Sequence, residues 1–91
     1  MSPLNIKKLN LIRVKLDKLD YNLLKLIKKR SNLVNEVLKI KSKKKEIIDQ
    51  KRINFILKKI KKKSIKLKID PKITNRIWKN MIWSFIDYEK R

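Results

Sequence analysis

The sequence predicts an all-α fold with three helices, and three observations support that prediction. Apolar residues recur every three or four positions over long stretches, which is the spacing of one helix face. The 91 residues include no glycine and only two prolines, so little interrupts these stretches. Asp49 and the pair Asp70 and Pro71 have the form of helix starts, because aspartate caps a helix and proline fits its first position.

The first predicted helix runs from about Leu4 to Lys43, a range without proline or glycine. Some 40 residues at a rise of 1.5 Å span roughly 60 Å, which exceeds the width of a compact domain of this size. We therefore expect this helix to pack against another chain. Its predicted contact face consists of Leu9, Ile12, Leu16, Leu19, Leu23, Ile27, Leu33, Val34 and Val37.

A run of three lysines at 43–45 should loosen the first helix before a second one begins. Asp49 is the expected N-cap of the second helix, which is predicted to fray after Lys63. The apolar positions of this helix fall on one side, as helical spacing requires. They are Ile53, Ile56, Leu57 and Ile60.

The third helix is predicted to start at Pro71, with Asp70 as its cap. A short alternation of Ile65, Leu67 and Ile69 precedes it, and we interpret this as a connection rather than a strand. The third helix carries most of the aromatic residues of the chain. Its predicted buried face consists of Ile73, Ile77, Met81, Ile82, Phe85 and Ile86.

Composition limits the possible functions. The chain has no cysteine and no histidine, so no disulfide, thiolate nucleophile, Cys/His zinc site or histidine general base is available. We expect no metal and no cofactor. No apolar run approaches the roughly 20 residues of a membrane span, and the first eight residues do not resemble a signal peptide. We therefore expect one small cytoplasmic domain spanning residues 1–91.

The formal charge of +20 is typical of nucleic-acid-binding proteins. However, the chain is crowded with Lys, Ile and Asn and lacks alanine, which is typical of a drift toward AT-rich codons. Most lysines are then solvated surface residues. The aromatic residues cluster near the C-terminus instead of alternating with cations, which argues against a base-stacking surface.

Only five of the 28 basic residues are arginine, so each arginine is informative. Arginine offers a planar fork that grips a carboxylate with two hydrogen bonds. Arg13 and Arg30 lie on or beside the apolar stripe of the first helix. Arg30 and Lys41 are eleven residues apart, so they point the same way about 16 Å apart.

Arg13 precedes Arg30 by seventeen residues, or about 25 Å of helix. Both arginines of one straight helix therefore cannot reach one small anion. If two long helices pair antiparallel in a symmetric dimer, Arg13 of the partner subunit approaches Arg30 and Lys41, which makes two equivalent sites. The competing interpretation of Arg13 is a surface cation that pairs with Asp17 or Asp20.

The order and spacing of these charged and apolar residues resemble the all-helical chorismate mutases, the type II family. The resemblance extends from about Leu9 to Glu89, nearly the whole chain, and includes a final helix similar to that of one bacterial branch. The matching positions are Arg13, Leu19, Asp20, Leu23, Leu24, Arg30, Val34, Val37, Lys41, Ile48, Asp49, Arg52, Asp70, Pro71, the run 77–82, Tyr88 and Glu89.

This resemblance implies an intertwined antiparallel homodimer of three-helix chains that converts chorismate to prephenate. That step, part of phenylalanine and tyrosine biosynthesis, is an intramolecular Claisen rearrangement that needs no proton transfer, nucleophile or metal. Catalysis then comes from holding the reactive conformer and stabilising charge on the ether oxygen. The implied catalytic residues are Lys41, Glu89 and Arg30, and the implied substrate-binding residues are Arg13 of the partner subunit, Arg30, Lys41, Asp49, Arg52 and Glu89.

By the same resemblance, Arg30 and Arg13 of the partner subunit clamp the two substrate carboxylates. Lys41 donates to the ether oxygen, and Glu89 lies on the other side of that oxygen. Asp49 and Arg52 bound the end that holds the ring hydroxyl. The competing interpretations are an N-cap alone for Asp49 and a surface cation for Arg52.

The chain departs from the family pattern at three positions. Ile53 stands where many members have a glutamate for the ring hydroxyl, and Phe85 stands where a small hydroxyl residue is common. Glu89 replaces a common glutamine, and a carboxylate there must be protonated to face a developing negative charge. Apolar neighbours favour that protonated form and Lys41 favours the ionised form, and the sequence leaves both open.

Two other functions remain compatible with the sequence. Isochorismate pyruvate lyases share the fold, also place an apolar residue after the second-helix arginine, and release pyruvate through a related cyclic transition state. The second alternative is a basic helical dimer that binds nucleic acid. It explains the charge but not the placement of Arg13, Arg30 and Lys41 along the apolar stripe.

Overall fold

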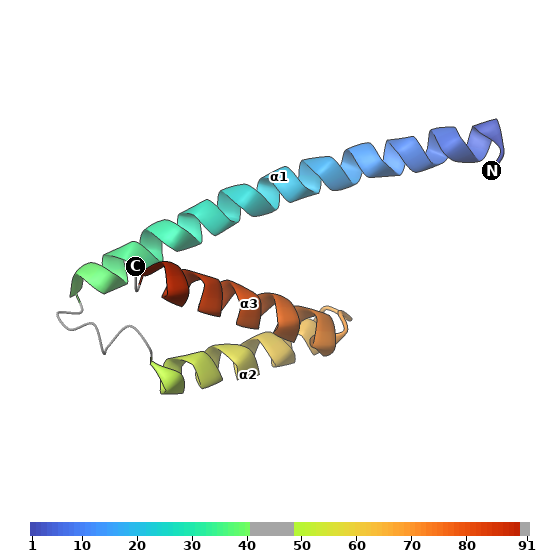
Figure 1. The fold of residues 1–91 in the computed structure, drawn as a ribbon. Helices are drawn as coiled ribbons and strands as arrows, with labels where there is room; N and C mark the ends of the chain where they lie inside the picture. Colours follow the sequence, from blue (N-terminus) through green and yellow to red (C-terminus); the bar gives the residue numbers. More distant parts are fainter. Residues whose placement is uncertain (41–48, 90–91) are drawn as a thin grey trace. The chain divides into compact units, whose positions relative to one another are not determined.

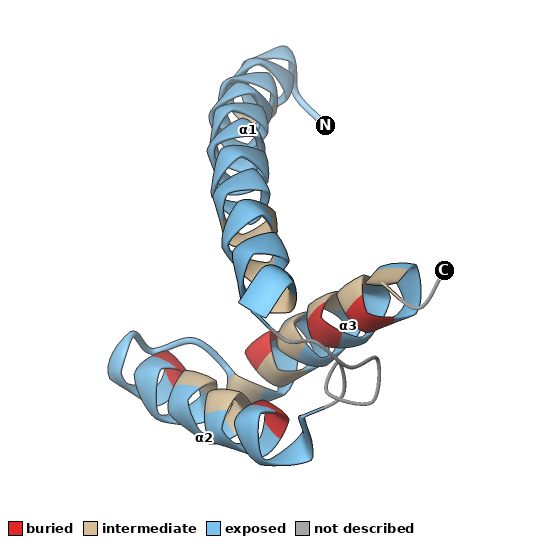
Figure 2. Ribbon diagram, turned by 90° about the vertical axis from the view of Figure 1, so that its left-hand side faces the viewer, coloured by how far each residue is buried: buried red, intermediate tan, exposed pale blue. Residues whose placement is uncertain are grey.

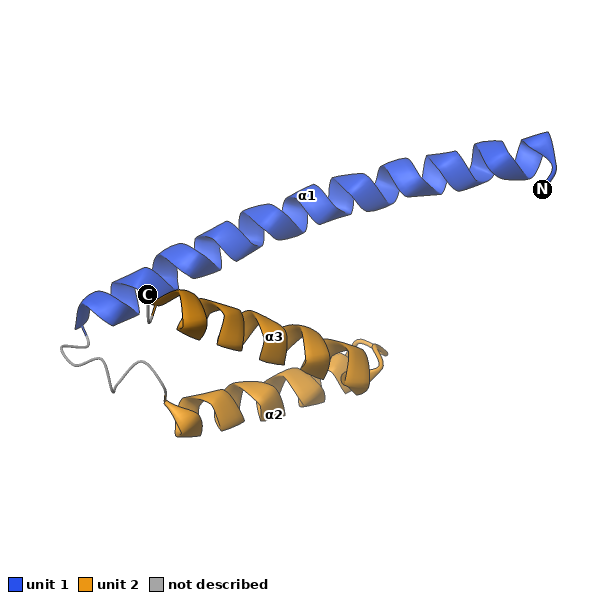
Figure 3. Cartoon of the chain, viewed as in Figure 1, with its two compact units in different colours: residues 1–40 blue, residues 41–91 orange. Residues whose placement is uncertain are grey.

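The computed structural model describes residues 1–40 and 49–89, and these form three helices without any strand (Figure 1). They are α1 (Pro3–Ile40), α2 (Gln50–Lys66) and α3 (Pro71–Glu89). The chain divides into two compact units, Met1–Ile40 and Lys41–Arg91, which are coloured separately in Figure 3. The predicted all-helical fold is confirmed. No helix in the described parts is long and apolar enough to cross a membrane.

α1 begins one residue earlier than expected, at a proline. Ser2 caps it, because its Oγ accepts the backbone N–H of Asn5 at 3.2 Å and its carbonyl accepts that of Ile6 at 3.0 Å. Proline suits the first helical position because its missing N–H would have no partner there. The predicted end at Lys43 lies outside the described residues, as does the lysine run 43–45.

α1 contains no buried residue over its 38 positions. At 1.5 Å per residue it is about 57 Å long. Its apolar residues stay open to solvent, and Leu16, Leu19 and Leu23 are 52 %, 58 % and 55 % exposed. Figure 2 shows this helix almost entirely in the colour of exposed residues. α1 therefore has an apolar side but no core of its own.

α2 begins at the predicted cap. Asp49 has extended backbone angles, and its Oδ1 accepts the N–H of Arg52 at 3.0 Å. The predicted apolar face is confirmed, because Ile53 is buried while Ile56, Leu57 and Ile60 are half-buried.

The predicted fraying of α2 after Lys63 is wrong, because the helix continues to Lys66. Its last turn is closed by hydrogen bonds from the amides of Leu67 to Lys63 and of Ile69 to Ser64, at 3.0 and 2.9 Å. Lys68 has a positive φ of 59°, the left-handed conformation that commonly ends a helix. Only Leu67 and Ile69 of the alternating residues therefore lie in the connection.

α3 begins at Pro71 as predicted, and Asp70 caps it by accepting the amide of Lys72 at 2.9 Å. Its buried residues are Thr74, Ile82 and Ile86. The prediction that Ile73 and Ile77 are buried is wrong for the single chain, in which they are 56 % and 51 % exposed. The predicted burial of Ile82 and Ile86 is confirmed, and Met81 and Phe85 are half-buried.

α2 and α3 form a hairpin with a small core (Figure 2). Ile53, Ile82 and Ile86 are buried together, and Ile56, Leu57 and Trp78 pack against them. Nearer the connection, the hydroxyls of Ser64 and Thr74 form a buried hydrogen bond of 2.6 Å. Both also bond within their own helices, Ser64 Oγ to the Ile60 carbonyl and Thr74 Oγ1 to the Pro71 carbonyl. The hairpin therefore has apolar packing at one end and a satisfied polar pair at the other.

Candidate active site

Two of the predicted site residues lie in the first turn of α2. The cap position of Asp49 fixes its carboxylate beside the backbone of Arg52, through the 3.0 Å hydrogen bond. The guanidinium of Arg52 lies over the ring of Phe55, 5.3 Å from its centroid. Both Asp49 and Arg52 are exposed. The predicted N-cap at Asp49 is thus confirmed, whereas the substrate-binding roles of Asp49 and Arg52 remain predictions.

The end of α3 lies at the same end of the hairpin as the start of α2. Burial of Ile53 with Ile82 and Ile86 places these two segments at the same end, and Figure 1 shows both at the end of the hairpin away from the connection. Glu89 is the last residue of α3, and it is half-buried, as is Phe85 one turn earlier. The hairpin thus gathers Asp49, Arg52 and Glu89 at its open end.

Ile53 has a packing role at the position where the resemblance leads one to expect glutamate. Only 6 % of its surface is exposed, and it belongs to the isoleucine core. A glutamate at this position would place a carboxyl group among apolar side chains, and burying it without a hydrogen-bond partner is unfavourable. The local packing therefore accounts for this departure from the family pattern.

Arg13 and Arg30 are both on α1 and belong to the other compact unit. Arg13 is exposed, whereas Arg30 is half-buried. The helix between them is continuous, so their separation along its axis is about 25 Å, as predicted. Lys41 lies outside the described residues.

The charge around the hairpin is strongly positive. α2 carries no acidic residue along its 17 positions. Its cations are Lys51, Arg52, Lys58, Lys59, Lys61, Lys62, Lys63 and Lys66. Such a one-sided charge attracts anions over distances of about a Debye length, roughly 8 to 10 Å. Six of these eight cations lie from Lys58 onward, so the positive charge is concentrated toward the connection rather than at the open end.

The residues in the described ranges do not form a metal site, because no three His, Cys, Asp or Glu side chains there gather closely enough. What the open end offers is a guanidinium and carboxylate oxygens. These groups can orient an anion with a hydroxyl group and place charge near a reacting bond.

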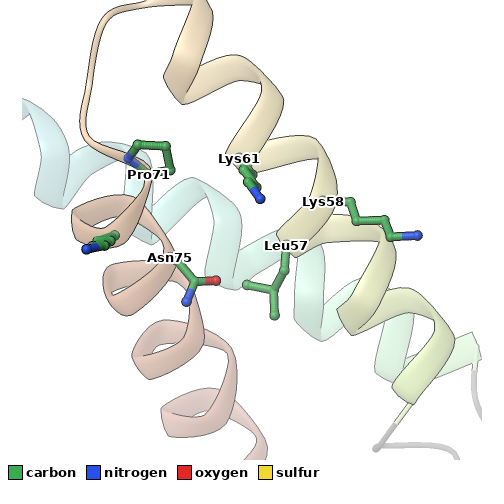
Figure 4. Close-up of a pocket in the computed structure, with 6 residues that line it drawn as sticks. Leu57, Lys58, Lys61, Pro71 and Asn75 are labelled. Carbon is green, nitrogen blue, oxygen red and sulfur yellow. The ribbon is translucent and has the colours of Figure 1, made fainter.

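A hollow between α2 and α3 was not foreseen from the sequence. It has a volume of about 370 Å³. Figure 4 shows its side chains, with Leu57 and Asn75 pointing toward each other between the helices. The sequence signal for this hollow is a pair of polar residues three positions apart on each helix, namely Lys58 and Lys61 on α2 and Lys72 and Asn75 on α3. We call it the lysine pocket, lined by Leu57, Lys58, Lys61, Pro71, Lys72 and Asn75.

Comparison with known proteins supplies the family. The model of one protein family, described as chorismate mutase type II, matches residues 12–90. Neither a curated protein nor a solved structure matches the chain. The match covers α2, α3 and α1 from residue 12 onward, and it includes every predicted site residue. The family's activity is that of chorismate mutase, an isomerase acting on chorismate, and the chain belongs to the chorismate mutase type II family.

Proposed function

We propose that this protein is a chorismate mutase that rearranges chorismate to prephenate in a composite site built by two chains. In this reaction the enolpyruvyl ether C–O bond breaks while a C–C bond forms across the ring. The electrons move in one cycle, and no proton is exchanged. The protein therefore has to select the compact reactive conformer and stabilise negative charge on the ether oxygen.

The observation that carries this proposal is the match along residues 12–90, which includes Arg13, Arg30, Asp49, Arg52 and Glu89. Apart from Asp49, a cap of α2, these positions have no evident role in packing the hairpin core. A chain that needed only three packed helices would not require arginine among so many lysines.

The dimer is proposed from the state of α1. A helix of 38 residues without a buried residue lacks the tertiary packing that stabilises most helices. Its exposed leucines and isoleucines would be covered if a second copy packed antiparallel along them. The same arrangement brings Arg13 of the partner subunit toward Arg30, which one chain alone cannot do across about 25 Å. The dimer then has two equivalent sites, and both chains contribute residues to each site.

Within this site, Arg30 and Arg13 of the partner subunit each grip one carboxylate of the substrate. Bidentate pairing holds both the position and the orientation of a carboxylate, which a lysine ammonium does not. Lys41 donates to the ether oxygen. Glu89, in its protonated form, donates to the same oxygen from the other side.

Asp49 and Arg52 form the end of the site that receives the ring hydroxyl. The carboxylate of Asp49 already accepts the Arg52 amide through Oδ1, and a carboxylate can accept several hydrogen bonds. The substrate hydroxyl is a further donor. With Ile53 committed to the core, Asp49 is the carboxylate at this end that can accept it.

The proposal is tested by measuring prephenate formation from chorismate with the purified protein. Arg30→Ala is expected to lower kcat/KM at least about a hundredfold, since it removes a charged donor from a substrate carboxylate. Arg30→Lys should restore little of it, because the fork is lost. Arg76→Ala is the control, because Arg76 is an exposed arginine of α3 and should leave the rate unchanged.

Pyruvate release from isochorismate is followed in parallel. Pyruvate without prephenate would replace the mutase with the lyase of the same fold. No product in either assay would overturn the proposal and direct attention to nucleic-acid binding, which would weaken steeply as salt is raised.

The role of Glu89 predicts a pH dependence. If the protonated carboxyl donates to the ether oxygen, kcat falls as pH rises and Glu89 ionises. Glu89→Gln keeps a donor at all pH values, so its profile should be flat. Profiles of kcat for the two proteins at saturating chorismate make the comparison. A flat profile for the unmodified protein would remove Glu89 from this role.

A further inference from the structure

We propose that the lysine pocket binds a small organic anion, a molecule with an apolar body and a single carboxylate or phosphate group. The pocket belongs entirely to the α2–α3 hairpin and is separate from the reaction site. Arg52 and Lys61 are nine residues apart on α2, or about 14 Å along its axis. The inference therefore does not depend on the proposed function.

The lining residues define the chemistry of the ligand. The floor is apolar, because Leu57 and Pro71 face the hollow and the lysine stems add methylene groups. Lys61 and Lys72 bring positive charge from opposite helices, and the Asn75 amide can donate a hydrogen bond. Lys58 extends away from α3 in Figure 4, so its ammonium lies at the outer edge. No carboxylate lines the pocket.

The nearest acidic residue in the sequence offsets only part of this charge. Asp70 precedes Pro71 and keeps one negative charge while its Oδ1 accepts the amide of Lys72, against the three lysines of the lining. α2 contributes only cations on its side. An anion in the pocket would therefore encounter net positive charge from both walls.

The size of the pocket also fits. Its volume of about 370 Å³ lies within the range of about 300 to 1,000 Å³ common for small-molecule sites. A single ion such as phosphate would leave the apolar floor uncovered. A ring or a short branched chain that carries the anionic group would cover it, which adds hydrophobic stabilisation to the charge.

The pocket stays accessible when the apolar side of α3 is covered. At 100° per residue, Asn75 lies about 160° around α3 from Ile77, and Lys72 about 140°. Ile73 and Ile77 are exposed apolar residues on one side of α3, which a second chain could cover. The pocket opens on the other side of the helix, so a dimer formed through the apolar side leaves it open.

Titration of the full-length ¹⁵N-labelled protein with phenyl phosphate tests this inference by NMR. At fixed salt, the amides of Leu57, Lys61 and Asn75 should shift and saturate. Inorganic phosphate tests charge alone and benzyl alcohol tests the ring alone, and both should bind more weakly than phenyl phosphate. Equal affinity for inorganic phosphate would overturn the pocket in favour of general attraction to the lysines.

Charge-neutralising variants locate the site. Lys61→Gln and Lys72→Gln should each weaken phenyl phosphate binding about fivefold, the effect of losing one ion pair near the surface. Lys63→Gln is the matched control, because it removes the same charge from α2 outside the pocket. It should change the affinity less than twofold. Equal losses in all three variants would contradict the proposal.

Two further measurements separate this site from the reaction site. Binding in an Arg30→Ala background should be unchanged, whereas its loss would place phenyl phosphate at the reaction site instead. Lys61→Gln should form prephenate at the same rate as the unmodified protein in the absence of phenyl phosphate. A lower rate would show that Lys61 belongs to the reaction site, which would overturn the assignment of a separate pocket.

Discussion

α1 and the α2–α3 hairpin are built from similar residues but differ in burial. α1 has 38 residues and buries none, whereas α2 and α3, with 17 and 19 residues, bury Ile53, Ser64, Thr74, Ile82 and Ile86. Both regions are rich in lysine and isoleucine. The hairpin thus finds packing partners within its own unit, whereas α1 buries no residue, and a second chain is the partner that we propose for it. Amino-acid composition alone therefore does not show whether a helix packs within its own chain or against a second chain.

The largest expected effect comes from a charge on the apolar side of α1. Leu16→Glu should separate the proposed dimer, at a cost of at least the roughly 2 to 5 kcal/mol of truncating a buried leucine. Prephenate formation should fall as the dimer separates, because no partner subunit then supplies Arg13 to the site. Sedimentation velocity at micromolar concentration measures the dimer, and far-UV circular dichroism measures the helix content.

Asn10→Glu is the control for that experiment. Asn10 is an exposed residue of α1 on a different side from the apolar stripe, and the substitution adds the same charge. It should remain dimeric. If both variants sediment alike, the stripe of α1 is not the surface that pairs.

Within the hairpin, the largest effect is expected from the hydroxyl pair. Thr74→Val keeps the shape of the side chain but removes the 2.6 Å bond to Ser64. A buried hydroxyl that loses a partner costs about 1 to 3 kcal/mol. Urea unfolding followed by the fluorescence of Trp78 and Trp83, at one fixed protein concentration, measures the change.

The double variant Ser64→Ala with Thr74→Val sharpens this result. Its loss should be smaller than the sum of the two single losses, because neither group is left unpaired by the other. Ser84→Ala, at an exposed position of α3, should change stability little. Additive losses would mean that the two hydroxyls do not stabilise the hairpin together.

Asp49 has a cap role that is observed and a substrate role that is proposed, and two substitutions separate them. Asp49→Asn should keep helix stability, because asparagine is also a good N-cap, whereas Asp49→Ala should cost about 1 kcal/mol. Both should raise the KM for chorismate if the carboxylate accepts the ring hydroxyl. An unchanged KM in Asp49→Asn would mean that Asp49 acts only as the N-cap of α2.

The smallest effect is expected at the connection, where Lys68 has its φ of 59°. Glycine adopts this conformation without the steric cost that a β-carbon adds, so Lys68→Gly should raise stability by about 1 kcal/mol. Lys66→Gly, inside the last turn of α2, should lower it by a similar amount. The melting temperatures of the two variants should therefore move in opposite directions.

The helix starts could be predicted from the sequence because their signals are local. Asp49 and Asp70 each accept an amide hydrogen bond from a residue two or three positions ahead, and Pro71 follows its cap directly. The end of α2 could not be predicted. It depends on Ser64, which is held by Thr74 ten residues away, and no local pattern reveals that bond.

The face of α3 was partly misjudged for a related reason. Thr74 is polar and lies outside the predicted apolar face, yet it is buried with its hydroxyl satisfied. Ile73 and Ile77 were expected inside because they are apolar, yet they lie beside the packed face. Spacing indicates which residues share a side of a helix, but not how wide the contact with the neighbouring helix is.

The candidate site was predictable only as a set of residue types and spacings. Asp49, Arg52 and Glu89 do share the open end of the hairpin, because the two helices run in opposite directions. Ile53, the residue after Arg52, is buried in the core because of how the two helices pack. The spacing of the charged residues does not reveal this. The meeting of Arg13 and Arg30 in one site remains a prediction, because it requires the proposed dimer.

The isoleucine at position 53 constrains how this protein can evolve. Arg52 and Ile53 are neighbours in sequence, but one side chain meets solvent and the other is sealed among Ile82 and Ile86. Replacing Ile53 alone with glutamate should therefore destabilise the hairpin by at least about 2 kcal/mol, the lower end of the cost of losing a buried isoleucine. A carboxylate beside Arg52 thus requires compensating changes at Ile82 and Ile86, so the three positions are expected to vary together.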